Sequence, residues 1–353
     1  MNETLTMTDA GFYCAAGDFY VDPWLPVPRA LITHAHGDHA RPESLAYLGV
    51  ADGLPLLRAR LGPEATIDTL RYDEPRRIGS VDVSFHPAGH VLGSAQIRIA
   101  HAGRVTVVSG DYKLAHDPTC TPFEPVRCDT FFTESTFGLP IFRWDETATT
   151  LGSIMTWWER NRADNRASVL FAYALGKAQR ILSGLVELVG ALPAPVFCHG
   201  AVERLNAAYR DAGIALPPTV AVADAPADTK WGQALIIAPP LAQGSPWMGR
   251  FEPYRTAFAS GWMAIRGTRR RRNLGRGFVL SDHADWEGLN RAIDATGASE
   301  VWVTHGYRDE LARWLTGHGR TARGLETPFE GEAGAAIAEP PLDISADPPV
   351  PNV

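Results

Sequence analysis

Cysteine is scarce in this sequence, with four residues in a chain of 353. Cys14, Cys120, Cys128 and Cys198 are scattered, and no pair has the CxxC spacing typical of a thiolate zinc site. The sequence therefore indicates neither a disulfide framework nor a zinc site built on cysteine. We expect all four to be buried free thiols.

Long hydrophobic runs are also absent. No apolar stretch approaches the roughly 18 residues that cross a bilayer, and the composition is that of a globular protein, with 45% hydrophobic and 21% charged residues. The first residues, MNETLTMTDAGFYCAAGDF, lack the basic start and apolar block of a secretory signal. We therefore predict a cytoplasmic protein that makes no contact with a membrane.

Positive charge is in the minority, and the formal net charge is −7. This balance argues against a uniformly basic nucleic-acid-binding surface. A local exception lies between residues 266 and 276, which contain Arg266, Arg269, Arg270, Arg271, Arg272 and Arg276. Guanidinium groups match phosphate oxygens, so Arg269, Arg270, Arg271 and Arg272 are predicted to follow a nucleic-acid backbone. A solvated basic loop is the alternative.

The length of the chain fits about two domains of roughly 150 residues each. Residues 11–112 contain short apolar runs that end in polar loops, a pattern that indicates strands. From 145 to 265 helix-like and strand-like segments alternate, which predicts an α/β unit with a parallel sheet. The residues from about 331 are rich in Ala, Pro and acidic groups and are expected to form a loosely ordered tail.

The stretch HAHGDHA crowds histidine and aspartate into one short loop after an apolar run. His34 and His36 are two residues apart, so on an extended segment they share a face. Gly37 is expected to permit a tight turn that brings Asp38 and His39 toward the same point. Neutral imidazoles suit zinc, and carboxylates can ligate or bridge metals. The loop therefore predicts a site for two metals.

Three more candidate ligands end apolar runs later in the chain. His90 closes HPAGH, Asp111 ends VVSGD and His305 ends VWVTH. Each alone is more often structural, but together with the first loop they complete a set of metal ligands.

These motifs resemble a known superfamily. The order HxHxDH, GHxxGS and SGD is similar to the metallo-β-lactamase superfamily of two-metal hydrolases, and FTESTFG, LSDHADW and VTHG resemble its β-CASP nuclease branch. The longer blocks GFYCAAGDFYVDPW, ESTFGLPIFRW and YALGKAQRIL resemble the bacterial ligase-associated DNA exonucleases. The resemblance implies an α/β fold, a metallo-β-lactamase αββα sandwich with an inserted β-CASP α/β domain. The expected boundaries are 1–142 and 266–330 for the sandwich, 143–265 for the insert and 331–353 for the tail.

The resemblance also implies a ligand set for two divalent metals, with zinc as the usual ion and manganese as an alternative. The first metal would be held by His34, His36 and His90. The second would be held by Asp38, His39 and His305, with Asp111 bridging the two. Asp22, in YVDPW, matches an aspartate that orients the imidazoles of this loop.

Glu134 and His283 match two further β-CASP motif positions and, with Asp38, are the expected catalytic residues. In the implied reaction a water whose pKa the metals lower attacks phosphorus in line, and the leaving oxygen must be stabilised or protonated. His283 is the expected proton donor, and Glu134 would hold that imidazole charged and oriented. Without the resemblance, Glu134 would be read as an acid at a strand end or helix cap.

Two lysines are predicted to bind substrate. Lys177 follows Gly176 at an expected helix start, where backbone N–H groups favour an anion such as phosphate. Lys113 lies two residues after Asp111, close to the expected metals. An ordinary surface lysine is the alternative for Lys113. The GxxxxGK[ST] spacing is absent around Lys177, so nucleotide hydrolysis is not indicated.

The resulting prediction is a two-metal DNA exonuclease, acting from 5′ to 3′, that processes DNA ends in repair before ligation. Its expected partners are DNA ends and, by resemblance alone, an ATP-dependent DNA ligase and a helicase. The runner-up is a β-CASP ribonuclease, because a histidine at the position of His305 is more typical of the RNA-processing branch.

Two other classes are less favoured by the sequence. A non-catalytic scaffold that binds nucleic acid would be expected to have lost ligands, and the set here is intact. A lactamase or thioesterase would lack an α/β insert between the SGD strand and the last histidine, where this chain has more than 100 residues.

Overall fold

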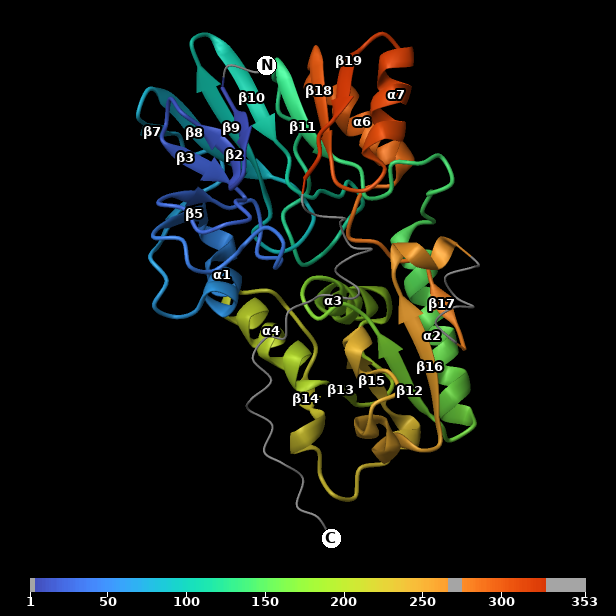
Figure 1. Ribbon diagram of the computed structural model, residues 1–353. Coiled ribbons are helices and arrows are strands. Elements are labelled where there is room, and N and C mark those ends of the chain that lie inside the picture. The colour runs from blue at the N-terminus through green and yellow to red at the C-terminus, as the bar shows by residue number, and fades with distance from the viewer. Residues whose placement is uncertain (1–3, 266–274, 328–353) are drawn as a thin grey trace.

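The structure is a computed structural model that describes residues 4–265 and 275–327 (Figure 1). The predictions made for Arg266, for Arg269 to Arg272 and for the tail 331–353 lie outside these residues. In Figure 1 two β-sheets and their helices form the upper part of the molecule, and a third sheet with its own helices forms the lower part.

The first sheet is made by the N-terminal segment and has the order β1-β2-β3-β4-β5-β6. Strands β1 to β3 are antiparallel, and β3 to β6 run parallel. Its strands are β1 (Thr6–Thr8), β2 (Gly11–Cys14), β3 (Phe19–Val21), β4 (Ala30–Leu31), β5 (Tyr47–Val50) and β6 (Ile67–Leu70).

The second sheet combines residues from both ends of the chain, in the order β19-β18-β11-β10-β9-β8-β7. Strands β7 to β10 form an antiparallel meander, and β10, β11, β18 and β19 are parallel. Its strands are β7 (Arg76–Ile78), β8 (Val81–Pro87), β9 (Ala95–His101), β10 (Arg104–Val108), β11 (Thr130–Glu134), β18 (Glu300–Thr304) and β19 (Thr321–Gly324).

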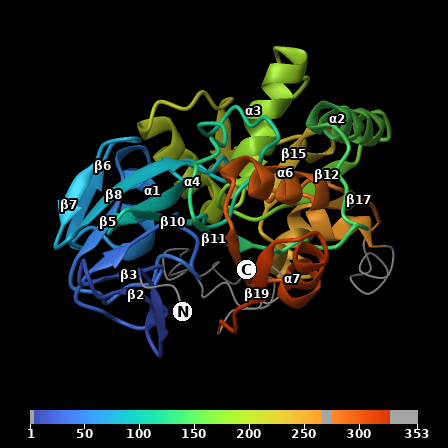
Figure 2. The same ribbon diagram turned by 90° about the horizontal axis from the view of Figure 1, so that it is seen from above.

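The two sheets pack face to face over a continuous hydrophobic core. Val81, Val83 and Phe85 occupy alternate positions of β8, so their side chains share one face, and all three are fully buried in this core with Phe19 and Val21 of the first sheet. Helices α6 (Trp286–Thr296) and α7 (Arg308–Gly317) cover the other face of the second sheet. Helix α1 (Leu54–Leu61) packs against the far side of the first sheet, opposite α6 and α7 (Figure 2). The upper part is therefore a four-layer α/β/β/α arrangement.

The third sheet is wholly parallel and has the order β14-β13-β15-β12-β16-β17. Helices α2, α3 and α4 pack on one face, and a cluster of buried side chains around short 3₁₀ turns covers the other. The helices are α2 (Thr147–Ala163), α3 (Lys177–Val189) and α4 (Gly200–Asp211). The strands are β12 (Ala167–Phe171), β13 (Val196–Cys198), β14 (Thr219–Ala221), β15 (Leu235–Ala238), β16 (Tyr254–Ala259) and β17 (Gly277–Phe278). The 3₁₀ turns among the described residues are η1 (Ala51–Gly53), η2 (Val222–Asp224), η3 (Trp231–Gln233), η4 (Pro240–Ala242), η5 (Pro246–Phe251) and η6 (Gly261–Ala264).

The predicted α/β class is confirmed, with one change in organisation. The sequence predicted that the inserted unit ends at residue 265, but β17 pairs in parallel with β16 and so belongs to the third sheet. The insert therefore extends to about residue 278 among the described residues. Within 4–265 and 275–327 no helix is both long and apolar enough to cross a membrane.

Gly93 is a position where the fold requires glycine. Its φ is +71°, and a Cβ atom there would lie 2.1 Å from the Cα of Gly53, which precedes α1. We expect Gly93→Ala to lower the unfolding free energy by about 2–4 kcal/mol, because left-handed strain and overpacking both contribute. Urea denaturation followed by circular dichroism measures the effect. Gly103→Ala is the matched control, because Gly103 has φ +79° with open space around it, so only the backbone strain should appear.

Candidate metal centre

The HAHGDHA loop follows β4 and folds into a turn held by backbone hydrogen bonds. The carbonyl of His36 accepts from the N–H groups of His39, at 3.1 Å, and Ala40, at 2.8 Å. The proposed role of Gly37 in this turn is wrong, because its φ is outside the left-handed region. A Cβ at Gly37 would instead approach the Arg60 guanidinium at 3.2 Å, a contact that a flexible side chain can adjust.

Four side chains converge on one point and together could hold a metal ion: His34, His36, His90 and Asp111. Nδ1 of His36 lies 3.1 Å from Nε2 of His34 and 3.0 Å from Nε2 of His90. The Asp111 Oδ2 atom is 3.6 Å from Nε2 of His34 and 3.8 Å from Nε2 of His90. Tetrahedral zinc with bonds of 2.0–2.1 Å places its ligand atoms about 3.3–3.4 Å apart. The donor set therefore fits such an ion in both chemistry and spacing.

The opposite ring nitrogens of two of these histidines are engaged by backbone carbonyls. Nδ1 of His90 donates to the carbonyl of Asp282 at 2.7 Å, and Nε2 of His36 to that of Leu175 at 3.4 Å. A carbonyl can only accept, so each ring carries its proton on that side and directs a lone pair toward the other ligands.

Burial favours the neutral form that ligation requires. The pKa values of His34 and His90 are well below the usual histidine value, first because both rings are buried and second because neighbouring imidazoles repel a proton. The pKa of His36 is also lowered by burial. These three rings are thus neutral ligands at neutral pH.

A second group of acidic and imidazole side chains adjoins the first across Asp111. Nε2 of His39 lies 3.5 Å from Oδ2 of Asp111 and 3.9 Å from Oδ2 of Asp38. Burial opposes a charge on His39, but Asp111, Asp38 and Asp22 together raise its pKa well above the usual value. Three carboxylates around one buried ring stabilise positive charge at this place, and a divalent cation could supply that charge.

His305 lies at the edge of this second group. Its ring centroid is 5.4 Å from that of His39, and both residues line one pocket with Asp22 and Asp38. The backbone of His305 has φ +54° and that of Asp22 has φ +42°. Such left-handed conformations are uncommon for residues other than glycine, although Asp and His adopt them more readily than most, and they often mark functional sites.

Asp22 braces His39 from the end of β3. Its Oδ2 atom accepts from Nδ1 of His39 at 2.7 Å, and its Oδ1 atom accepts from the backbone N–H of Thr33 at 2.8 Å. Nε2 of His39 is thereby directed toward Asp38 and Asp111.

We expect Asp22→Asn to weaken one bound metal by about 10–100-fold, because outer residues that orient ligands have effects of this size. Titration of the metal-free protein with Zn²⁺ against a chromophoric chelator measures the two affinities separately. Equal weakening of both metals would contradict a role chiefly at His39, since Asp22 reaches His34 only through Oγ1 of Thr33.

Glu134 and His283 form a buried pair next to the metal ligands. Nδ1 of His283 lies 2.9 Å from Oε2 of Glu134, and Oε1 of Glu134 accepts from the Tyr112 N–H at 2.8 Å. The same Nδ1 is 4.0 Å from Oδ2 of Asp111, and the rings of His283 and His90 are 4.7 Å apart. Because Nδ1 faces the carboxylate, a proton transfer to substrate would use Nε2 of His283.

Glu134 and His283 could also be metal ligands, a role that the sequence did not suggest. Asp111, Glu134 and His283 also bring one donor atom each to within 4.8 Å of one another, so they too could hold a metal ion. This group and the group of His34, His36, His90 and Asp111 therefore have Asp111 in common.

The structure argues against the predicted substrate contacts of Lys113 and Lys177. Both side chains are buried, with exposed fractions of 1% and 0%. Nζ of Lys113 is 2.6 Å from Oδ2 of Asp117, and Nζ of Lys177 is 3.2 Å from Oδ2 of Asp282. A lysine closed off from solvent and paired inside the protein cannot meet a substrate phosphate without a rearrangement of the core. Asp117, Arg180 and Asp282 surround these lysines, and no motif in the sequence indicated that they form ion pairs there.

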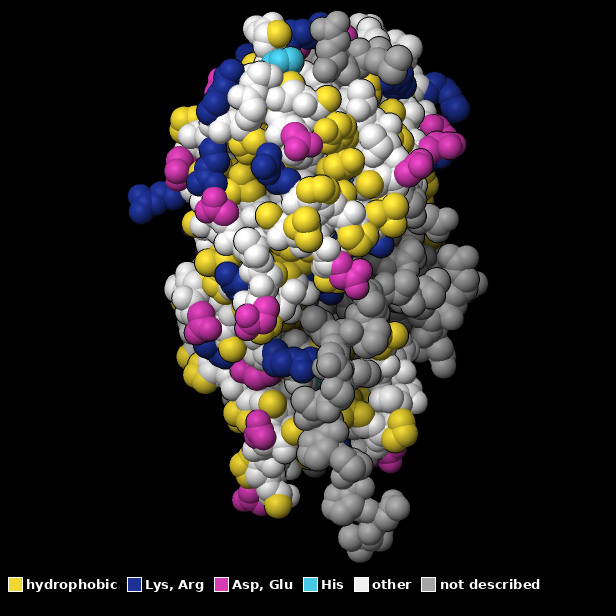
Figure 3. All heavy atoms as spheres, turned by 60° about the vertical axis from the view of Figure 1, so that its left-hand side comes forward, with side chains coloured by type: hydrophobic (Ala, Val, Ile, Leu, Met, Phe, Trp, Pro, Cys, Tyr) yellow, Lys and Arg dark blue, Asp and Glu magenta, His cyan; other side chains and the backbone are white. Residues whose placement is uncertain are grey.

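Arg269, Arg270, Arg271 and Arg272, which were predicted to bind substrate, lie outside the described residues. On the face drawn in Figure 3, basic and acidic side chains of the described residues are interspersed, and no broad basic area is seen.

Several known proteins are similar to this chain in sequence. No family model matches the sequence. "Probable DNA ligase" from Opitutus terrae is 31% identical over 334 residues, which make up 94% of this chain and 32% of that protein. "Endoribonuclease ysh1" from Emericella nidulans is 34% identical over 128 residues, 34% of this chain and 14% of that protein. The chain thus spans about a third of the first relative and about a seventh of the second.

Solved structures with a similar fold include a protein from Enterococcus faecalis. The crystal structure of a protein of unknown function from Enterococcus faecalis aligns with a TM-score of 0.57, covering 86% of this chain and 80% of that chain at 12% identity. At this identity the likeness concerns the fold alone. The two sequence relatives confirm the resemblance that the motifs indicated.

Proposed function

We propose that this chain is a two-metal nuclease similar to the β-CASP branch of the metallo-β-lactamase superfamily, with its third sheet as the β-CASP insert. The observation that carries the proposal is the convergence of His34, His36, His90 and Asp111 on one point, with the buried Glu134–His283 pair against it. The match to "Endoribonuclease ysh1" supports phosphodiester hydrolysis as the reaction.

The donor set supports two divalent metals, of which zinc suits the imidazoles best and manganese is the alternative. His34, His36 and His90 would hold one ion, while Asp38, His39 and His305 would hold the other and Asp111 would join both. When bound, the metals would supply Lewis-acid stabilisation of the phosphoryl oxygens and lower the pKa of water.

The protein's own groups account for the remaining steps. His283 gives a proton from Nε2 to the leaving oxygen of the phosphodiester, and Glu134 fixes the ring by accepting from Nδ1. The pair is buried, so bulk water competes poorly for this hydrogen bond. Asp22 and the carbonyls of Leu175 and Asp282 keep the ligand imidazoles oriented.

We further propose that the substrate is DNA and that the enzyme trims ends from 5′ to 3′ before ligation, in the cytoplasm. The match along 94% of the chain to a protein named "Probable DNA ligase" supports this substrate and motivates a ligase, together with a helicase, as partners. The second candidate is an RNA substrate, favoured by the match to an endoribonuclease and by the presence of His305.

The test uses pure protein loaded with Zn²⁺ or Mn²⁺ and a DNA strand labelled separately at each end, with RNA of the same sequence beside it. We expect short products from the 5′-labelled DNA first and slower cleavage of RNA. Faster cleavage of RNA would replace the DNA assignment by the ribonuclease. If protein carrying two metals cuts neither strand, the nuclease proposal fails.

A further inference from the structure

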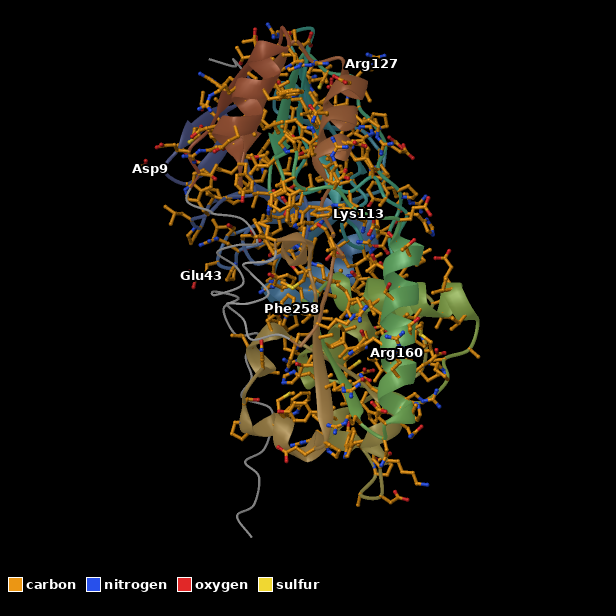
Figure 4. All side chains as sticks on the ribbon, turned by 90° about the vertical axis from the view of Figure 1, so that its right-hand side faces the viewer. Asp9, Glu43, Lys113, Arg127, Arg160 and Phe258 are labelled. Carbon is orange, nitrogen blue, oxygen red and sulfur yellow. The ribbon has the colours of Figure 1, made fainter. Side chains whose placement is uncertain are left out.

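Five charged side chains form a buried cluster at the junction between the four-layer part and the inserted unit. We call Lys113, Asp117, Lys177, Arg180 and Asp282 the junction cluster. None of them has an exposed fraction above 5%. Lys113 and Asp117 follow β10, Lys177 and Arg180 are on α3, and Asp282 precedes α6. In Figure 4 Lys113 lies close to the level at which the upper part of the molecule meets the inserted unit.

Ion pairs within the junction cluster connect the two units. Lys177 and Arg180 of the inserted unit lie 3.2 and 3.4 Å from the two carboxylate oxygens of Asp282. Nε of Arg180 is 3.6 Å from Oδ2 of Asp117, which also pairs with Lys113 at 2.6 Å. Each carboxylate, carried by a loop outside the inserted unit, thus pairs with at least one cation on α3.

The same side chains hold the loop that contains His283. Nη1 of Arg180 donates to the carbonyl of Ser281, and Nη2 donates to Oγ1 of Thr147 at 2.8 Å. Oγ of Ser281 in turn accepts from the backbone N–H of His283 at 3.0 Å. Arg180 therefore holds the backbone of Ser281 directly, and Ser281 in turn holds the backbone of His283.

That backbone orients a metal ligand. The carbonyl of Asp282, one residue after the carbonyl that Arg180 holds, accepts from Nδ1 of His90 at 2.7 Å. A second contact comes from Lys113, whose Nζ donates to the His90 carbonyl at 3.4 Å. The inserted unit also supplies the Leu175 carbonyl that faces Nε2 of His36.

We propose that Arg180 is a positioning residue for the site of His34, His36 and His90, and that α3 of the inserted unit maintains the geometry of this one metal site. Buried ion pairs add little net stability compared with packed apolar groups, so their value here lies in fixing the Asp282 carbonyl against His90. This inference rests on the proposed metal binding of the same site.

Arg180 should affect the two proposed metal sites differently. Asp22, at the end of β3, orients His39, and the polar side-chain contacts of His39 within the described residues are to Asp22, Asp38, Asp111 and Thr33, all outside the inserted unit. Loss of the Arg180 contacts should therefore weaken the metal held by His34, His36 and His90 and leave the other unaffected. Asp22→Asn should weaken chiefly the other metal, with a smaller effect on this one, because Oγ1 of Thr33 links Asp22 to Nδ1 of His34 at 3.1 Å.

The experiment is a Zn²⁺ titration of metal-free wild type, Arg180→Lys and Asp22→Asn against a chromophoric chelator, repeated with Co²⁺ so that absorption bands identify the site. Lysine keeps the charge but loses the fork that reaches Ser281, Asp282 and Thr147 together. We expect Arg180→Lys to weaken one of the two ions by about 10–100-fold, as for other outer residues that orient ligands. The Co²⁺ bands of the imidazole-rich site should change, while the second affinity stays at the wild-type value.

Two further variants test whether the effect of Arg180→Lys comes from its particular contacts. Thr147→Val removes only the Nη2 contact of Arg180, and it should cause a smaller change in the same metal. Arg210→Lys is the matched control, because Arg210 forms a similar pair with Glu203, at 2.9 Å, within the inserted unit. Its metal affinities should equal those of wild type.

Unchanged affinities in Arg180→Lys, or equal weakening of both metals with a lower unfolding temperature, would overturn the inference. Neither result affects the proposed function if the wild type binds two metals and cuts nucleic acid. Absence of metal binding or cleavage by the wild type would instead defeat the proposed function itself.

Discussion

Asp111→Asn is expected to lower the rate of phosphodiester hydrolysis by at least about 10³-fold, equivalent to roughly 4 kcal/mol of transition-state stabilisation. Oδ2 of Asp111 lies between the two ligand groups, 3.6 Å from Nε2 of His34 and 3.5 Å from Nε2 of His39. Its pKa is held well below the usual carboxyl value, because the neighbouring imidazoles His39 and His283 outweigh the effect of burial. The charge that the substitution removes is therefore present at neutral pH and would serve both of the proposed metals.

Single-turnover cleavage of end-labelled DNA measures this loss, and elemental analysis of the same sample measures metal content. We expect fewer than two metals per chain in the variant. Asp68→Asn is the control, because Asp68 pairs with Arg76 at the surface and is remote from the ligands in sequence. A variant of Asp111 that kept both metals and wild-type turnover would remove the bridging carboxylate from the mechanism.

The convergence of the ligands could be anticipated from local sequence features. His34, His90 and Asp111 each follow an apolar run; β8 and β10 run in the same direction in the second sheet and so bring His90 and Asp111 to one edge, whereas His34 follows a strand of the first sheet, which packs against the second. In the structure His34 follows β4, His90 follows β8 and Asp111 follows β10. Their approach depends on the strand order, which periodicity alone does not reveal, and the resemblance to a known family supplied that information.

Features that depend on tertiary packing were harder to predict. Lys113 and Lys177 were expected to reach substrate, because a lysine is rarely buried without a partner and the sequence does not show that Asp282 lies beside Lys177. Asp282, for example, is 105 positions after Lys177. The boundary expected at residue 265 also leaves out β17, which pairs with β16 but contains only Gly277 and Phe278 and so gives no periodic signal.

His283→Ala is expected to keep both metals and to lower turnover by about 10²–10⁴-fold, the usual range for loss of a positioned general acid. The imidazole is 2.9 Å from Glu134, while His90 and Asp111 have their own partners, so the ligand sets of the two metals remain after truncation. A DNA substrate with sulfur at the leaving position provides a specific test, since a thiolate leaves without protonation. The variant should cut that substrate at nearly the wild-type rate.

The control for this variant is His116→Ala, which removes an exposed histidine paired with Glu187 at 3.1 Å. Loss of a metal from His283→Ala would point instead to the alternative arrangement, in which Asp111, Glu134 and His283 hold an ion together. In that case the sulfur substrate would not rescue cleavage, because the missing component would be the cation rather than a proton. Metal content and sulfur rescue therefore distinguish a proton donor from a ligand at the same ring.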